Sequence, residues 1–307
     1  MKFTVEQQKD AFLTLAKSGL YINYGPEKLL ETYKELTEFL KFRGESIDEI
    51  DLCNLYELQF YLALMTNEDV TAKICLTRLC DRFLPEKSQR IKLMQSIYLE
   101  STENDETAKK KLGGNNDETR LMRRLTTFSR KENENKDYID SLIRYIDLQP
   151  SNLQTWAELA DEYAKIKQFD KSIYCWKEVL LQVPLAYNIF YKVGLMYYYY
   201  FLEEVSFKLE KKEKVLGLMD ILVNARNNFL RSVEICDSYS KSWLGAYVVC
   251  ENEFNKTISR VLKNEKHAKS YLSDCEKILK LSRRKFMENE DINDDQFMKL
   301  IDRHNLQ

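Results

Sequence analysis

The chain has 307 residues, of which 44% are hydrophobic and 31% charged, so it can bury a core beneath a well-solvated surface. Eight glycines and four prolines are too few for an all-β fold with many turns, and a net charge of −2 gives no overall attraction to nucleic acid or anionic lipid. Seven cysteines without a C-x-x-C pair predict reduced, mostly buried thiols in the cytosol. We expect no signal peptide and no membrane span, because the longest near-continuous apolar run, residues 189–202, contains Lys192 and is too short.

The first third of the chain has the periodicity of amphipathic helices. Thr4 and Gln7 form a capping-box pattern at the first helix, and Pro26 suits the first turn of the second. Pro85 closes a pair of helices, and Gly113 stops a short one, so we expect a degenerate repeat before residue 117. The predicted helices are 4–17, 26–42, 48–65, 69–83, 88–100 and 103–112.

Helices predicted over 117–130 and 136–147 lead into a central stretch bounded by Pro150 and Pro184, which are 34 positions apart. Large residues recur at spacings of three and four on one helix face, and small residues stand where two helices must approach closely. This is the pattern of a tetratricopeptide repeat, and it predicts that Trp156 is a core residue between two helices. Counted from Leu153, positions 4, 7, 8, 11, 20, 24, 27 and 32 are Trp156, Leu159, Ala160, Tyr163, Ser172, Trp176, Val179 and Pro184.

The residue that ends one repeat stands six residues before position 4 of the next, and this spacing recurs along the chain. The pairs are Pro85 with Ile91, Pro150 with Trp156, Pro184 with Phe190, and Asp237 with Trp243. An ordinary helical bundle, the alternative, would not produce that spacing. A single hairpin cannot bury its apolar face alone, so the sequence predicts an all-α tetratricopeptide-repeat (TPR) solenoid of stacked helical hairpins.

We expect the solenoid to occupy residues 1–281, with its clearest repeats at 119–152, 153–186, 187–239 and 240–281. The third of these begins with a helix over 188–202. It then has 27 residues between Tyr197 and Ala225 where a standard repeat has about eight. This insert, at about 203–219, either extends the helices or loops out. An amphipathic helix over 264–281 caps the array, and 282–307 is expected to be a polar tail with one short helix near 297–301.

Residues that could carry chemistry are few. The histidines His267 and His304 have no cysteine or carboxylate at ligand spacing, which favours solvated surface side chains over metal ligands. No Lys-Ser or Lys-Thr pair follows Gly113-Gly114, which excludes a phosphate loop. Asp161 and Glu162 belong to a helix surface rather than to an acid–base pair. We therefore predict no enzyme activity, no cofactor and no metal site.

The candidate site is instead a protein-binding groove. In TPR arrays, positions 2, 5, 9 and 12 of each first helix line the concave face. This surface is polar at one end and aromatic at the other, which suits a helix or an extended segment of a protein partner. Arg123 and Tyr191 are expected to point away from their own repeat cores. The predicted groove residues are Arg120, Arg123, Thr127, Arg130, Gln154, Ala157, Asp161, Ala164, Asn188, Tyr191, Leu195 and Tyr198.

Two patches can each be interpreted in two ways. The basic helix over 120–131 suits an acidic segment or a phosphate, or else it is a solvated face balanced by the acidic residues of 132–140. The aromatic run 197–201 either packs or binds, and we expect Tyr197 and Phe201 in the core with Tyr198 facing the groove. The cationic residues of the basic helix are Arg120, Arg123, Arg124, Arg130 and Lys131.

The two-carboxylate clamp that grips chaperone tails is incomplete in this sequence. Arg123 and Lys192 stand at clamp positions, but Thr127, Glu158 and Asn188 break the pattern, and Glu158 would repel a carboxylate.

One family resemblance rests on the central repeat. Residues 156–163, Trp-Ala-Glu-Leu-Ala-Asp-Glu-Tyr, and 169–180, Phe-Asp-Lys-Ser-Ile-Tyr-Cys-Trp-Lys-Glu-Val-Leu, resemble the central repeat of subunit 2 of the ER membrane protein complex. Segments 55–57, 90–92 and 142–146 resemble its earlier repeats in the same order, so the resemblance covers about residues 50–250. The short second helix near Gly113 and the insert after Leu202 depart from the family pattern.

The resemblance implies a non-catalytic scaffold subunit, held at the cytosolic face of the ER membrane by its partners in a hetero-oligomer. It would bind cytosolic loops and tails of the membrane subunits, and so support the insertion of tail-anchored and multi-pass proteins. The alternative is a soluble TPR adaptor or co-chaperone that binds an unrelated peptide. A third reading, an RNA-processing repeat scaffold, is disfavoured by the nearly neutral net charge, and we expect no nucleic-acid partner.

Overall fold

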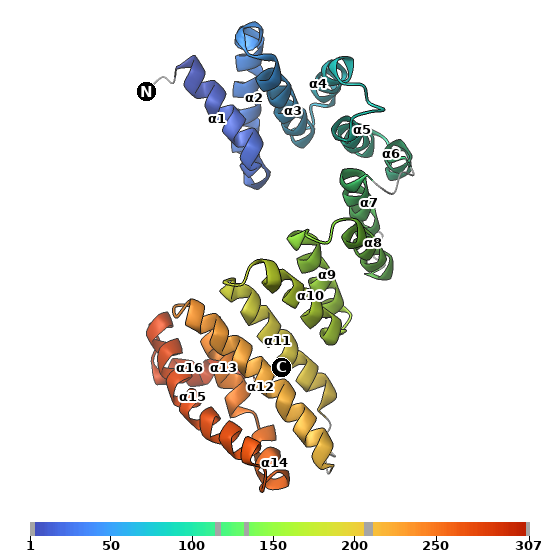
Figure 1. The fold of residues 1–307 in the computed structure, drawn as a ribbon. Coiled ribbons are helices and arrows are strands. Elements are labelled where there is room, and N and C mark those ends of the chain that lie inside the picture. The colour runs from blue at the N-terminus through green and yellow to red at the C-terminus, as the bar shows by residue number, and fades with distance from the viewer. Residues whose placement is uncertain (1–3, 114–117, 132–134, 206–210, 305–307) are drawn as a thin grey trace. The chain divides into compact units, whose positions relative to one another are not determined.

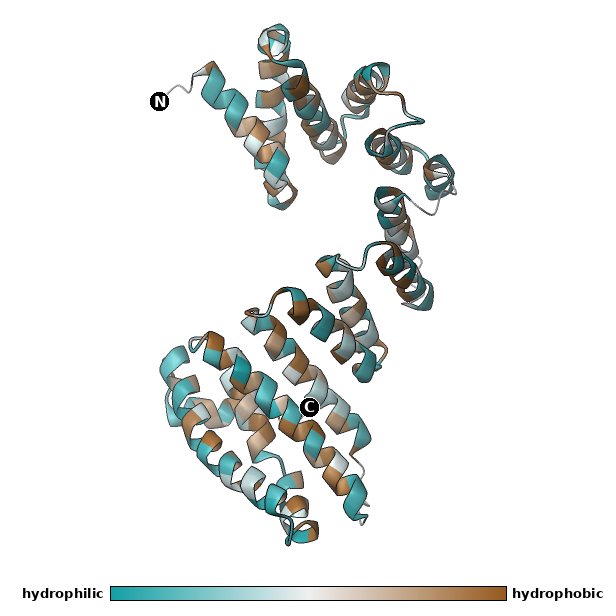
Figure 2. Cartoon of the chain, in the orientation of Figure 1, coloured by the Kyte–Doolittle hydropathy of each residue, from teal (hydrophilic) through white to brown (hydrophobic). Residues whose placement is uncertain are grey.

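The computed structural model describes residues 4–113, 118–131, 135–205 and 211–304, and these fold into α-helices joined by short turns (Figure 1). The all-α prediction is confirmed. Apolar and polar residues alternate around the helices rather than forming uniform runs, which is the pattern of helices with one buried face (Figure 2). The chain divides into two compact units, Met1–Ser141 and Leu142–Gln307.

The first unit contains antiparallel hairpins whose ends match the predicted ones to within a few residues. The capping box is present, because the Gln7 amide donates to Thr4 Oγ1 and the Thr4 amide donates to Gln7 Oε1. The helices are α1 Val5–Ser18, α2 Pro26–Arg43, α3 Glu49–Met65, α4 Asp69–Arg82, α5 Gln89–Thr102, α6 Asp105–Leu112 and α7 Thr119–Lys131, followed by α8 Asn135–Leu148, which continues into the second unit.

Helix α3 is the centre of the first core, which joins buried residues of α2, α3, α4 and α5. One buried polar side chain lies in this core and is hydrogen-bonded through both polar atoms of its amide. The Gln59 amide donates to Thr37 Oγ1 at 3.1 Å and its carbonyl oxygen accepts from Cys75 Sγ at 3.1 Å, which ties α2, α3 and α4 together. The short helix α6 packs mainly against α5, and its Ala108 and Leu112 also form a separate apolar cluster with Leu121 and Phe128 of α7.

The second unit shows the close helix approach that the repeat pattern predicts. The Ser172 hydroxyl donates to the Ala160 carbonyl at 2.8 Å, so the two small positions meet where α9 and α10 cross. A Cβ on Gly245 would lie 2.6 Å from the Phe229 ring, so only glycine fits at this crossing. The helices are α9 Leu153–Lys165, α10 Phe169–Gln182, α11 Tyr187–Glu204, α12 Lys212–Ile235, α13 Ser240–Glu251, α14 Phe254–Val261, α15 Lys266–Glu290 and α16 Asp294–His304.

The predicted insert at 203–219 lengthens a hairpin. Helix α11 continues to Glu204 and α12 begins at Lys212, while 206–210 lie outside the described residues. The new first turns of α12 bury Val215, Leu218 and Met219 in a core that also holds Phe201. Of the two alternatives, extension of the helices is the one observed, because these apolar residues continue the buried face.

The folded part of the chain extends beyond residue 281. Helix α15 runs on to Glu290, the chain turns at Asp291 in a left-handed conformation with φ of 51°, and α16 follows. Phe286, Phe297 and Ile301 are buried together with Trp243. The short helix near 297–301 is therefore observed, but the expectation of a polar tail is corrected, because a few widely spaced apolar residues pack this segment onto α13.

Candidate partner-binding surfaces

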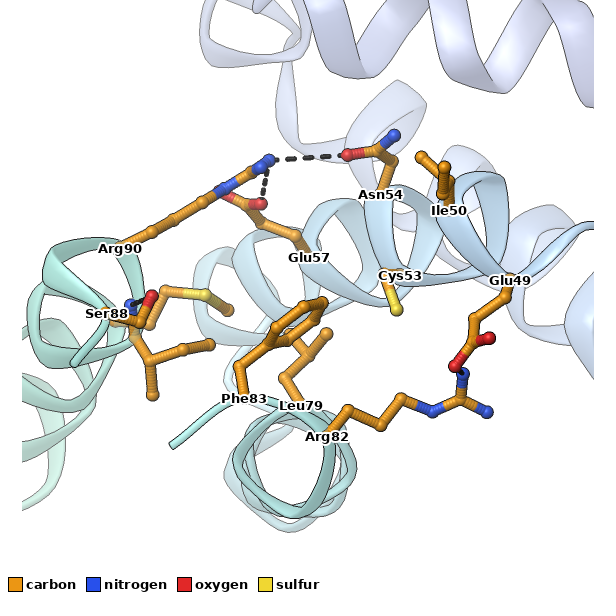
Figure 3. Close-up of a pocket in the computed structure, with 12 residues that line it drawn as sticks. Glu49, Ile50, Cys53, Asn54, Glu57, Leu79, Arg82, Phe83, Ser88 and Arg90 are labelled. Atoms are coloured by element: carbon orange, nitrogen blue, oxygen red, sulfur yellow. Dashed lines mark hydrogen bonds and ion pairs between the residues drawn. The ribbon is translucent and has the colours of Figure 1, made fainter. Parts of the chain in front are cut away.

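A pocket of about 450 Å³ lies on the first unit between α3, the end of α4 and the start of α5 (Figure 3). Leu79, Phe83, Ile91 and Met94 give it apolar walls. The predicted groove does not include this pocket, because the early repeats lack a clear tryptophan marker. The sequence signals near it are the spacing of Pro85 and Ile91 and the repeat-like segments 55–57 and 90–92.

Charged side chains at the rim of this pocket are paired with one another. Arg90 forms an ion pair with Glu57 and donates to Asn54 Oδ1 at 3.4 Å, and Arg82 pairs with Glu49 (Figure 3). Burial raises the pKa of the Cys53 thiol, against the lowering effect of the Arg82 charge, so the thiol stays protonated near neutral pH. The pocket therefore offers an apolar floor with a balanced rim, which suits an uncharged side chain of a partner.

A second, smaller hollow of about 150 Å³ adjoins α1 and shares Asn54, Glu57 and Arg90 with the first. Tyr21 and Tyr61 add aromatic walls. We call the side chains shared by both hollows, Asn54, Glu57 and Arg90, the Arg90 group. This group lies between the two hollows on the side formed by α1, α3 and α5, the first helices of their hairpins. This is the side on which TPR positions facing a ligand are expected.

On α7, three of the four predicted groove residues, Arg120, Thr127 and Arg130, are exposed, while Arg123 is half-buried. Arg124, which belongs to the same basic patch, forms an ion pair with Glu100 and covers the Phe128 ring at 4.5 Å. The basic helix is therefore not a uniformly solvated face. One of its cations helps to hold α7 onto α5.

On α9, Gln154 and Asp161 are exposed, and Ala157 and Ala164 are half-buried. The Asp161 carboxylate accepts from Lys192 Nζ of α11 at 3.3 Å, and the same ammonium lies 4.1 Å from the centre of the Trp176 ring. An ion pair between two consecutive first helices is consistent with the face predicted for Asp161.

On α11, Asn188 is exposed, but Tyr191, Leu195 and Tyr198 are half-buried and pack against the core of the second unit. The Tyr191 ring lies 5.7 Å from the Phe229 ring and 5.6 Å from the Tyr239 ring, and burial raises its pKa. The expectation that Tyr191 points away from its own repeat core is wrong.

The reason is the next hairpin, which closes over α11. The Tyr198 hydroxyl accepts from Asn252 Nδ2 at 3.5 Å, and its ring stacks on Phe201 at 6.3 Å. Phe201 is buried as predicted, whereas Tyr197 is half-buried with its hydroxyl accepting from Lys177 at 2.8 Å. Packing is therefore the observed role of much of the aromatic run. The twelve predicted residues fall in both units, and a single groove across them stays a prediction.

The six-residue spacing has a physical cause in the second unit. The Trp156 indole N–H donates to the Pro150 carbonyl at 2.8 Å, and the Trp243 indole N–H donates to the Asp237 carbonyl at 2.8 Å. In each case the tryptophan bonds to the residue two positions after the end of the preceding helix, α8 or α12. Proline and aspartate serve equally well, because only the backbone oxygen is used.

Comparison with known proteins agrees with these repeats. TPR repeat protein oca3 of Schizosaccharomyces pombe is 29% identical over 267 residues, which are 83% of this chain and 87% of that protein. ER membrane protein complex subunit 2 of Saccharomyces cerevisiae is 26% identical over 248 residues, 76% of this chain and 82% of that protein. The chain is a tetratricopeptide-repeat protein homologous to ER membrane protein complex subunit 2.

A solved structure supports the fold alone. The C-terminal part of a TPR repeat-containing protein from Cytophaga hutchinsonii superposes with a TM-score of 0.51 at 10% identity, covering 92% of this chain and 97% of that one. No model of a protein family matches the sequence. The TPR assignment is confirmed by this structure and by the named relatives.

Trp156 does not occupy the position in the core that the sequence predicted for it. It is half-buried and lines a pocket of about 360 Å³ with Ile143 of α8 and Tyr174 of α10. The fully buried tryptophan of this repeat is Trp176, which is 1% exposed. Trp156 lies at an open edge, because none of the described residues of the second unit covers the groove between α8 and α10 at this point.

The described part of the chain offers neither a metal-binding cluster nor a membrane-spanning helix. No cluster there brings together three side chains able to hold a metal ion. Among the same residues, every helix is too short or too polar to cross a membrane.

Proposed function

We propose that the chain is a non-catalytic scaffold subunit of the ER membrane protein complex. It binds cytosolic loops and tails of the membrane subunits, and through this it supports the insertion of tail-anchored and multi-pass proteins into the ER membrane. The observation that carries the proposal is the similarity to subunit 2, which extends over 82% of that protein and 76% of this chain. A similarity of this extent reaches beyond one generic hairpin.

The surfaces of the two units suit such a role. Stacked first helices present exposed polar side chains beside apolar hollows, and such surfaces accept extended or helical segments of other proteins. The first unit offers the Arg90 group and the pocket beside it, and the second offers Gln154, Asp161 and Asn188. We place the partner segments on the predicted groove residues of each unit, those from Arg120 to Arg130 in the first and those from Gln154 to Tyr198 in the second.

We place the protein at the cytosolic face of the ER, attached through its partners. Its net charge of −2 gives little electrostatic attraction to anionic lipid. In cell fractionation, the protein should sediment with ER membranes and move to the soluble fraction when the membrane subunits are deleted. Retention on protein-free liposomes at physiological salt would instead indicate direct lipid binding, for which α7 is the first helix to test.

The deciding experiment is affinity purification of the tagged chain from membranes solubilised in mild detergent, followed by identification of its partners. The proposal predicts recovery of integral subunits of one complex in stoichiometric amounts. Recovery of the chain alone, or only with soluble proteins, would refute the assignment to the complex.

A matched pair of variants tests the groove itself. Gln154→Arg with Asn188→Arg adds two large cations at exposed groove positions and should reduce recovery of the partners without changing the melting temperature. Leu181→Arg, at an exposed site on α10, is the control and should leave recovery unchanged. Equal recovery with both variants would exclude this part of the groove as the main interface.

The exposed Arg120 and Arg130 on α7 favour one second candidate, a soluble adaptor for an acidic peptide. That function predicts a partner in the soluble fraction and a binding constant that falls steeply with salt. Charge reversal at Arg120 and Arg130 would then abolish binding, whereas a scaffold with a distributed interface would lose only part of its affinity.

A further inference from the structure

Trp156 and Trp243 occupy the same repeat position but differ in what covers them. Each lies on the first helix of a hairpin, between the second helix of the preceding hairpin and the second helix of its own. For Trp156 these flanking helices are α8 and α10. For Trp243 they are α12 and α15, which follows the short α14 and packs against α13 in the place of a second helix. Trp243 is only 5% exposed, whereas Trp156 stays half-buried.

Helix α16 of the chain itself fills the groove over Trp243. Its Phe297 is fully buried, 5.1 Å from the Tyr247 ring and 5.6 Å from the Phe286 ring. Ile301, four residues later, is buried in the same cluster. Asp294, at the start of α16, pairs with Arg283 of α15 at 3.1 Å, so an acidic residue at the end of the helix meets a basic side chain of α15.

The equivalent groove over Trp156 is open and has walls of the opposite charge. Tyr174, 58% exposed, meets the Trp156 ring edge-on at 6.1 Å. Asp147 and Asp170 are exposed among the residues that line this pocket of about 360 Å³. The one cation in the lining, Lys171, lies with its ammonium 5.3 Å from the centre of the Tyr163 ring.

We propose that the Trp156 pocket is a docking site for a short amphipathic helix of another protein, which presents one aromatic side chain flanked by lysine or arginine. The aromatic side chain would take the place beside Trp156 and Tyr174 that Phe297 takes beside Tyr247 and Phe286. The flanking cations would face Asp147 and Asp170. Aromatic anchors in a pocket with charged groups at its rim are the usual arrangement of a strong contact site.

This site is distinct from the predicted concave groove, because the pocket lining contains none of the twelve groove residues. The proposal does not depend on membership of the ER membrane protein complex. A TPR protein with both surfaces could hold one partner segment on the first helices and a second one between the second helices.

The chain supplies its own probe. A fluorescent peptide with the sequence of residues 294–304, in which Asp294, Asp295 and Asp302 are replaced by lysine, keeps the spacing of Phe297, Leu300 and Ile301 and reverses the charge. Fluorescence anisotropy with the full-length chain should show saturable binding. The unaltered acidic peptide and the basic peptide with Phe297→Ala should each bind at least about tenfold more weakly.

Variants of the chain locate the site. Trp156→Ala should weaken binding of the basic peptide about tenfold or more, and Asp170→Lys should weaken it several-fold, with a smaller dependence on salt. Asp170 is exposed, so its variant reports on binding even where Trp156→Ala reduces folding. Leu181→Ala, an exposed change outside the pocket lining, is the control and should bind like the unaltered chain.

Three results would overturn the proposal. One is the absence of saturable binding of the basic peptide up to about 1 mM. Another is equal binding by the chain and by both pocket variants. The last is a dimer in solution that Trp156→Ala dissociates, which would show that a second copy of the chain occupies the pocket.

Discussion

The hairpins that carry Trp156 and Trp243 share their local design and differ in their surroundings. Both indoles donate to the backbone carbonyl six residues earlier, at 2.8 Å. In both first helices the residue before the tryptophan, Thr155 or Ser242, is fully buried. Only one of the two grooves is closed, because α16 folds back over Trp243. The repeat pattern therefore determines the hairpin, whereas distant sequence determines how far its largest side chain is buried.

Truncating a side chain should lower the free energy of unfolding more in the closed groove over Trp243 than in the open groove over Trp156. Trp243→Ala and Phe297→Ala each remove a large side chain from a sealed core and should cost about 3–5 kcal/mol in the free energy of unfolding. Because neighbouring repeats stabilise each other, the loss should spread through the second unit. Urea denaturation followed by circular dichroism measures the change. A cost below about 1 kcal/mol for Phe297→Ala would show that α16 does not seal the groove.

A second, smaller loss of stability is expected where two helices of the second unit approach closely. Gly245→Ala would place a Cβ 2.6 Å from the Phe229 ring and should cost about 1–3 kcal/mol. Gly217 in α12 has no atom within 4 Å of the added Cβ, so Gly217→Ala is the control and should stabilise by about 0.4–1 kcal/mol. Thermal unfolding compares the pair, and the same sign for both would contradict the packing described here.

Trp156→Ala should lower the free energy of unfolding by about 1–2 kcal/mol, which is less than the loss for Trp243→Ala. The reason is that the Trp156 side chain is half-buried and borders a solvent-open pocket. The expected loss combines the indole hydrogen bond to Pro150 with part of the apolar burial. Denaturation under the conditions used for Trp243→Ala gives the comparison. Equal costs at the two positions would mean that the groove over Trp156 is closed in solution.

The smallest expected change in stability comes from surface ion pairs. A hydrogen bond and the charge of Asp237 raise the pKa of Lys285, so this pair stabilises the fold below the ordinary lysine pKa and is lost as pH rises through the raised value. The difference in melting temperature between the chain and Asp237→Asn should therefore stay constant below the ordinary lysine pKa and shrink as the pH rises above it. The matched change Asp161→Asn, in the hairpin with the open groove, should alter stability by less than about 1 kcal/mol. A difference that grows with pH would contradict the pairing.

Sequence reasoning predicted the elements whose signals are local. Capping at Thr4, the small pair Ala160 and Ser172, and the positions of the central hairpins depend on residues close along the chain. The sequence shows the spacing from Pro150 to Trp156, and the structure shows its cause, the indole hydrogen bond. These features follow from helix geometry, which a single repeat already encodes.

The incorrect predictions concern long-range packing. Tyr191 stands at a concave position by count, but Tyr239 of the following hairpin packs against it. The cover over Trp243 depends on Phe286 and Phe297, which a polar segment surrounds and which have no repeat signature. The Trp156 pocket and the Arg90 group also depend on which helices flank a residue, and position within the repeat does not specify this.

The most direct test of the difference between the two grooves is acrylamide quenching of single tryptophans. The variant with Trp176→Phe and Trp243→Phe leaves Trp156 as the reporter, and the variant with Trp156→Phe and Trp176→Phe leaves Trp243, with circular dichroism checking that both stay folded. Trp156 should be quenched several-fold more strongly and emit at a longer wavelength, because its ring borders an open pocket while Trp243 is 5% exposed. Equal quenching of the two reporters would contradict the open and closed grooves described for this protein.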